Sequence, residues 1–287
     1  YLFITNTGEL SVHIEKLQFL AKAMLPMPDK MHGIADAEIR QRQRYYDLIG
    51  SSLQVEHEGL TTREVFEVRA KTISSLRRFL EDNGYVEVET PMLTPKATGA
   101  AAKPFKTHHN ALDIDLYARI APELYLKRLV VGGFEKVYEL NRNFRNEGIS
   151  YKHNPEFTML EFYCAYMDVN GMMDFAETML RQAVLRATGG LKVRYENREL
   201  DFETPFLRIS MKDLVDKFLK DNPDVGRRGI GDEDVVSLFE EFVESTITDP
   251  VFIIDYPKSI SPLSKASPEN PEIAEDRKST RLNSSHS

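Results

Sequence analysis

Residues 138–164 read YELNRNFRNEGISYKHNPEFTMLEFYC, and this stretch decides the fold. Alternating side chains predict two strands, over about 135–145 and 156–166, because successive strand residues point to opposite faces. One face of each strand is apolar, and the other mixes charged with aromatic residues. The connection from Asn146 to Pro155 carries turn-forming residues at both ends. We therefore expect two antiparallel strands joined by a loop.

The mixed face has two interpretations that spacing alone leaves open. One is the solvated face of an antiparallel sheet, where charges are common. The other is a ligand pocket, favoured by the aromatic and Met side chains between the charges. There an arginine would hold phosphate or carboxylate, an aromatic ring would stack on a purine, and a carboxylate beside a tyrosine would suit an ammonium group. The residues expected on this face are Glu139, Asn141, Asn143, Arg145, Phe157, Met159, Glu161 and Tyr163.

Helical and strand patterns flank this strand pair. Helices are expected over about 62–82, 122–131, 172–187 and much of 210–245. Strands are expected before Pro91 and over about 251–256. Thr61 or Thr62 caps the first helix and Gly84 ends it, whereas residues 94–106 have the composition of a mobile loop. Together these patterns predict an α+β fold with an antiparallel sheet flanked by helices.

Composition narrows the class of protein. The 287 residues are 41% hydrophobic, which is enough for a core, and suffice for one large domain or one domain plus part of another. A net charge of -8 argues against a generally basic nucleic-acid binder, although a local basic strip stays compatible with it. The single cysteine, Cys164, excludes a disulfide framework and a cysteine-based zinc site within this chain. With no leader pattern and no long apolar run, we expect a soluble cytoplasmic protein.

Two segments, FRNEG at 144–148 and HNPEFTMLE at 153–161, resemble motif 2 of the class II aminoacyl-tRNA synthetases. Their residues are most similar to those of the bacterial lysyl-tRNA synthetases. The expected helix 63–83 and the strand ending at Pro91 resemble motif 1, which forms much of the dimer interface in that family. The resemblance runs from Thr5 to Arg277. It implies an OB-type anticodon-binding barrel remnant over 1–25, a linker over 26–62 and a catalytic domain over 63–277.

The resemblance also implies roles for individual residues and partners. ATP would be held by Arg145, Glu147, His153 and Phe157. Lysine would be held by Gly99, Glu123, Arg145, Glu161 and Tyr163, with Arg145 as the catalytic residue that meets both the α-phosphate and the lysine carboxylate. The implied activity is formation of lysyl-adenylate from lysine and ATP, followed by transfer of the lysyl group to tRNA(Lys). Mg²⁺ and a second copy of the chain, forming a homodimer, would take part.

The two ends of the sequence carry further expectations. In the family, the magnesium ligands, further lysine contacts and motif 3 follow the position of Arg277, so we expect no metal ligands in this chain and little or no activity from it. Residues 278–287 have the composition of a non-native tail. Three alternatives stay open: an aspartyl- or asparaginyl-tRNA synthetase, a lysine ligase acting on a protein, and a non-catalytic binding or regulatory protein descended from a synthetase.

Overall fold

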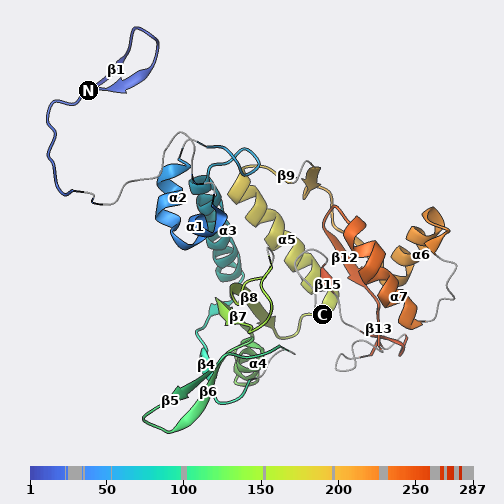
Figure 1. Cartoon of the computed structure of the whole chain (residues 1–287). Coiled ribbons are helices and arrows are strands. Elements are labelled where there is room, and N and C mark those ends of the chain that lie inside the picture. The colour runs from blue at the N-terminus through green and yellow to red at the C-terminus, as the bar shows by residue number, and fades with distance from the viewer. Residues whose placement is uncertain are drawn as a thin grey trace. The chain divides into compact units, whose positions relative to one another are not determined.

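The computed structural model describes most of the chain: residues 1–22, 24, 34, 36–52, 54–97, 102–150, 153–195, 198–225, 232–258, 266–267, 270–274 and 278–279. It divides into two compact units, Tyr1–Val65 and Phe66–Ser287. Figure 1 shows a mixture of helices and strands, which makes the fold α+β. Within the described part, no helix has the length and apolar character that crossing a membrane requires.

The first unit begins with a small hairpin. Strands β1 (Leu2–Ile4) and β2 (Leu10–Val12) pair antiparallel, and Gly8 takes a left-handed backbone with φ of 86° in the turn between them. The described hairpin has two strands, so an OB-type barrel stays a prediction. Of the predicted linker 26–62, the prolines at 26 and 28 lie outside the described residues. Its described part is not merely extended, because it carries helices α1 (Ala37–Arg42) and α2 (Arg44–Gly50).

A buried carboxylate joins these two helices. Asp47 is 1% exposed and accepts hydrogen bonds from Arg40 Nε at 2.8 Å, Arg44 Nη1 at 2.7 Å and Ser51 Oγ at 3.1 Å. Burial by itself raises the pKa of Asp47, but the hydrogen bonds from Arg44, Arg40 and Ser51 outweigh it, and the net pKa lies below the usual value. Asp47 therefore stays ionised in the folded unit.

Helix α3 (Thr62–Asp82) has the bounds that the sequence predicts. Thr61 and Glu64 form a capping box: the Glu64 N–H donates to Thr61 Oγ1 at 3.3 Å, and the Thr61 N–H donates to Glu64 Oε2 at 2.7 Å. Gly84 follows the helix with φ of 79°, a conformation that suits a residue without Cβ. The chain then enters the short strand β3 (Val86–Glu87).

The central sheet has the order β3-β7-β8. Strands β7 (Lys136–Phe144) and β8 (Glu156–Cys164) pair antiparallel along nine residues, from Lys136 opposite Cys164 to Phe144 opposite Glu156. Strand β3 pairs with β7 in the parallel direction, so the prediction of a purely antiparallel sheet is wrong at this edge. A parallel neighbour requires a crossover, and the chain from β4 to α4 supplies one between β3 and β7.

The apolar face of this sheet packs under two long helices. Leu80 of α3 is fully buried, and Met179 comes from α5 (Val169–Thr188), which ends at Gly189 with φ of 83°. Both join a cluster with the strand residues that alternation assigned to this face, which confirms the predicted facing. The cluster consists of Phe79, Leu80, Tyr85, Tyr138 and Met179, with Leu76, Leu160, Phe162, Cys164 and Phe175 against it.

Between β3 and β7 the chain forms a second small sheet and a helix. This sheet has three antiparallel strands in the order β4-β6-β5: β4 (Leu93–Thr94), β5 (Lys106–His109) and β6 (Ile114–Ala118). Alternation did not predict it. Helix α4 (Glu123–Val131) follows Pro122, as expected. Of the predicted loop 94–106, residues 98–101 lie outside the described part of the chain.

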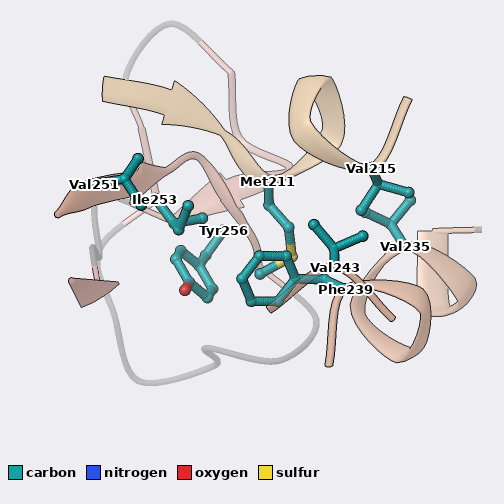
Figure 2. Packing of buried hydrophobic residues seen from close by; sticks show 8 residues of the cluster. All are labelled: Met211, Val215, Val235, Phe239, Val243, Val251, Ile253 and Tyr256. Carbon is teal, nitrogen blue, oxygen red and sulfur yellow. The ribbon is translucent and has the colours of Figure 1, made fainter. Parts of the chain in front are cut away.

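The C-terminal part has its own core, drawn in Figure 2. Hairpin β9 (Lys192–Tyr195) and β10 (Arg198–Asp201) leads to β11 (Leu207–Ser210), which pairs in parallel with β12 (Val251–Ile254). Helices α6 (Met211–Asp221) and α7 (Asp232–Leu238) lie between them in sequence, and a π-helical turn, Phe239–Val243, extends α7. The core comprises Met211, Val215, Val235, Phe239, Val243, Val251, Ile253 and Tyr256.

Short strands complete this part of the chain. Strand β13 (Tyr256–Pro257) pairs with β14 (Ile273–Ala274), and β15 (Lys278–Ser279) pairs antiparallel with β12. Thus the first two residues of the C-terminal segment form strand pairs that its composition did not predict. Residues 280–287 lie outside the described chain, and the non-native origin of the segment stays a prediction.

Candidate ligand-binding face of the central sheet

The second face of β7 and β8 is the mixed face that alternation predicts. Glu139 lies opposite Glu161, Asn141 opposite Met159, and Asn143 opposite Phe157. Glu139 and Asn143 are each 1% exposed, so this face is not the solvated surface of an ordinary antiparallel sheet. Asn143 donates to Met159 Sδ at 3.1 Å, and its Oδ1 is buried without a hydrogen-bond partner among the described residues. Buried polar atoms of this kind favour a pocket over a wet surface.

Arg145 and Phe157 form one end of this face. The guanidinium carbon of Arg145 lies 5.2 Å from the ring centroid of Phe157, within the range of a cation–π contact. The Arg145 N–H donates to the Pro155 carbonyl at 2.9 Å, which closes the connection between the strands next to the side chain. Arg145 Nε is buried and has no partner within the described chain. The structure therefore brings a partly unsatisfied cation and an aromatic ring together.

The connecting loop places the other two residues expected to bind ATP. His153 and Ser150 share a short contact, 2.7 Å between Nδ1 and Oγ, and the His153 N–H also donates to Ser150 Oγ at 3.1 Å. His153 Nε2 is buried without a partner among the residues described, so one ring nitrogen is available to a ligand. Glu147 is exposed in the same loop. The contacts with Ser150 orient the His153 ring, and the ATP-binding roles of His153 and Glu147 both stay predictions.

Glu161 and Tyr163 form the other end of the face. Tyr163 Oη donates to Glu161 Oε2 at 3.1 Å. Burial raises the pKa of Glu161 above its usual value, and the like charges of Glu123 and Glu139 raise it further, while the hydrogen bond from Tyr163 lowers it. Burial, followed by the charges of Glu161 and Glu123, also raises the pKa of Tyr163, so its hydroxyl stays protonated at neutral pH. An incoming cation would relieve this crowding of negative charge.

Helix α4 contributes an acid and a base to the same end. Glu123 is the first residue of α4, where its carboxylate meets the positive end of the helix dipole, as the sequence predicts. Lys127, one turn later, places Nζ 2.5 Å from Glu123 Oε1 and 6.0 Å from the Tyr163 ring centroid. An ammonium group of this chain therefore already lies near both this carboxylate and this tyrosine ring. Lys127 was not predicted to lie at this site, although the i, i+4 spacing of Glu123 and Lys127 indicates an ion pair on one face of a helix.

The remaining predictions for this site concern Gly99 and the metal ligands. Gly99, expected to contact the lysine α-amino group, lies outside the described residues. Among the described residues, no group of three His, Cys, Asp or Glu side chains is close enough together to hold a metal ion.

A family model of the tRNA synthetases class II (D, K and N) matches residues 36–284. The match covers most of the chain, and the chain belongs to this family.

Among curated relatives, the chain is similar to proteins named lysine–tRNA ligase. That of Burkholderia vietnamiensis is 50% identical over 298 aligned residues, which cover 96% of this chain and 57% of the relative. Those of Cupriavidus pinatubonensis and Ralstonia nicotianae are 49% and 48% identical, again over 96% of this chain, with 56% and 57% of the relatives covered. The chain thus spans just over half the length of these relatives.

Proposed function

We propose that this chain carries the lysine- and ATP-binding face of a lysine–tRNA ligase. The observation that carries the proposal is the half-buried Glu161–Tyr163 pair on the same strand as Phe157, with Glu123 beside it and Arg145 at the far end. The names of the relatives point to the same activity.

The acidic end suits the side chain of lysine. A half-buried carboxylate whose pKa is raised by burial and by like charges binds an ammonium group favourably, because the cation offsets both penalties. The protonated hydroxyl of Tyr163 donates to Glu161 and presents an oxygen that accepts a hydrogen bond from the ammonium. Aspartate or asparagine would place an anion or a neutral amide against the same carboxylates, which disfavours both. We assign Glu161 and Tyr163 to the lysine ammonium, and Glu123 with Gly99 to its α-amino group.

The other end suits a nucleotide. Phe157 offers a ring for adenine, and because Arg145 lies over that ring in the free protein, a purine must stack on the opposite face or displace the guanidinium. Arg145 Nε and His153 Nε2 have no hydrogen-bond partner among the described residues, and both are suited to phosphate oxygens. In this assignment Glu147 accepts from the adenine amino group and His153 meets the distal phosphates.

The spacing of the two ends fits one extended ligand. Phe157 and Glu161 are four residues apart on β8, which is roughly 13 Å along an extended strand. Because four is an even number, both side chains point to the same face. Lysine and ATP can thus lie in line across the strands, with the adenine at one end and the lysine ammonium at the other. The reacting atoms would then meet between the two ends.

The first step is displacement at phosphorus. An oxygen of the lysine carboxylate attacks the α-phosphorus of ATP, the bond to the β-phosphate oxygen breaks, and lysyl-adenylate and pyrophosphate result. The carboxylate is ionised at neutral pH, so no side-chain base is needed. Arg145 holds the lysine carboxylate and α-phosphate together and stabilises the charge that develops on the equatorial oxygens. The terminal ribose hydroxyl of tRNA(Lys) then attacks the lysyl carbonyl, and AMP leaves.

Further parts of the proposal follow from the family. Mg²⁺ accompanies ATP as the counter-ion of its phosphates, with no ligand assigned to it among the described side chains. We propose that the protein acts as a homodimer in the cytoplasm. The β1–β2 hairpin belongs, in this proposal, to an anticodon-binding OB barrel.

Lysine-dependent exchange of labelled pyrophosphate into ATP, measured on the complete gene product that contains this sequence, tests the proposal. We expect exchange with lysine and none with aspartate or asparagine. Glu161→Gln should remove most of the response to lysine. Its matched control is Glu156→Gln, which changes a 54%-exposed carboxylate at the start of the same strand. If the wild type exchanges without lysine, or if both variants lose activity equally, the assignment of the acidic end is wrong.

A further inference from the structure

The side chains of Arg119 and Glu139 form a buried ion pair next to the proposed lysine site. They are 2% and 1% exposed, and Arg119 Nη1 lies 2.6 Å from Glu139 Oε1. A buried pair of this kind costs desolvation free energy that two apolar side chains of the same size would not. No role for Arg119 was predicted from the sequence. Its presence in the interior therefore calls for a reason beyond packing.

The pair ties three segments of the chain together. Arg119 Nε donates to the Arg142 carbonyl on β7 at 3.1 Å, and Nη1 donates to Thr90 Oγ1 at 3.0 Å. Thr90 Oγ1 in turn donates to Glu139 Oε2 at 2.6 Å, and Asn141 Nδ2 donates to Glu139 Oε1 at 3.1 Å. The end of β6, the segment after β3 and strand β7 are thus fixed to one carboxylate. Glu139 has little freedom to turn away.

This carboxylate faces the proposed site. Glu139 is the cross-strand partner of Glu161, and both lie on the mixed face. Directly opposed side chains have Cβ atoms about 5 Å apart, and like charges in this arrangement repel. The charged groups that act on Glu161 are Glu123 from α4, Glu139 from β7 and Arg119, which directly follows β6. Tyr163 lies on the same strand as Glu161, and the ammonium of Lys127 lies over the Tyr163 ring. Of the two charges of the buried pair, Glu139 raises the pKa of Glu161 and Arg119 lowers it.

We infer that Arg119 is a positioning residue for the ammonium pocket: it fixes Glu139 and the β7 backbone opposite Glu161, and supplies the positive charge that allows two carboxylates to stand face to face. The inference rests on the proposed function, because it concerns the lysine end of that site. Arg119 acts through Glu139 and does not itself contact lysine. It sets the pH range over which Glu161 stays ionised and the pocket accepts a cation.

The test measures the KM for lysine and the KM for ATP in pyrophosphate exchange between pH 5.5 and 8.5, on the complete gene product and its variants. Arg119→Met should raise the pH at which lysine affinity is half lost on acidification by about half a unit or more, because it removes a cation near Glu161. Arg119→Met combined with Glu139→Gln should bring that midpoint back down, because the opposing charge is removed as well. The KM for ATP should change less than threefold in both.

Controls separate the possible failures. Arg119→Lys keeps the charge, so its midpoint should stay near that of the wild type even if the protein is less stable. If Arg119→Met does not fold, Glu139→Gln alone decides the matter, since the inference requires it to lower the midpoint. An unchanged midpoint in the folded variants, with the KM values for lysine and ATP altered alike, would show a purely structural role and overturn the inference. A wild type without lysine-dependent exchange would instead overturn the proposed function, and the inference with it.

Discussion

Replacing Tyr163 by phenylalanine tests the acidic end of the site with the removal of one oxygen. The ring remains, so packing on β8 and the contact with the Lys127 ammonium are retained. The hydroxyl that donates to Glu161 Oε2 at 3.1 Å is lost. That hydrogen bond opposes the effect of burial and lowers the pKa of Glu161. In Tyr163→Phe, Glu161 should therefore become protonated at a higher pH than in the wild type.

The size of the effect follows from the kind of bond. A hydrogen bond to a charged group contributes about 1.5–3 kcal/mol, which corresponds to about 10- to 150-fold in an equilibrium constant. The full change in lysine affinity is expected only at pH values where Glu161 is ionised in the wild type and protonated in the variant. Because Glu161 has the higher pKa in the variant, these pH values lie on the acidic side of the range. The ratio of the KM for lysine in the variant to that in the wild type should therefore be largest at the acidic end of the pH range and fall as pH rises.

The assay is lysine-dependent pyrophosphate exchange between pH 5.5 and 8.5. The KM for ATP should change less than twofold, because Phe157 is six residues from Tyr163 on the strand, roughly 20 Å away. Tyr166→Phe is the matched control, since Tyr166 is 97% exposed and the same oxygen is removed. A KM ratio for lysine that stays constant with pH, or that grows as pH rises, would refute the link between Tyr163 and the ionisation of Glu161.

Three further outcomes are expected. Arg145→Ala should reduce adenylate formation at least about a hundredfold, seen in single-turnover kinetics, because it removes the charge that we propose meets the α-phosphate; near-normal rates would reject that role. Ile253→Ala should lower the free energy of unfolding by about 2–5 kcal/mol in urea titrations, because the side chain is fully buried, whereas Leu207→Ala at a 57%-exposed position should cost less than about 1 kcal/mol. Asp47→Asn should increase hydrogen exchange in α2 at neutral pH. Since the pKa of Asp47 is lowered by folding, the difference from the wild type should be complete above about pH 4 and vanish as pH falls further; equal exchange at pH 7 would contradict this.

Local patterns gave the fold of the central sheet and its helices. The bounds of α3 follow from a capping box at Thr61 and a left-handed glycine at position 84, both of which are local signals. Alternation along β7 and β8 assigned Tyr138, Leu160, Phe162 and Cys164 to the face that packs under the helices, because the strand period is two and one face must be buried. The parallel pairing of β3 with β7 was missed, since strand direction in a sheet depends on the crossover between strands and not on either strand's own residues.

The part of the candidate site formed by side chains of a single strand was predictable from the sequence. Glu161 and Tyr163 lie on one face by alternation, and their hydrogen bond confirms that they meet. The pair of Arg119 and Glu139 was not predictable in this way, because the two residues come from different elements and a charged residue in a strand is ordinarily assigned to solvent. Only the register of β7 against β8 and the position of β6 show that Glu139 faces Glu161.

The long register between β7 and β8 limits how this protein can change in evolution. With nine residues paired in sequence, deletion of a single codon within either strand would turn every later side chain from the ligand face to the helix face. Such a deletion exchanges the hydrophobic interior and the proposed binding surface at once, so no compensating point mutation restores both. Length changes in natural homologues should therefore collect in the connection 145–155 and after Cys164, and be rare within the strands. The connection can thus acquire new lengths, and with them new contacts, while the chemistry on either side is left in place.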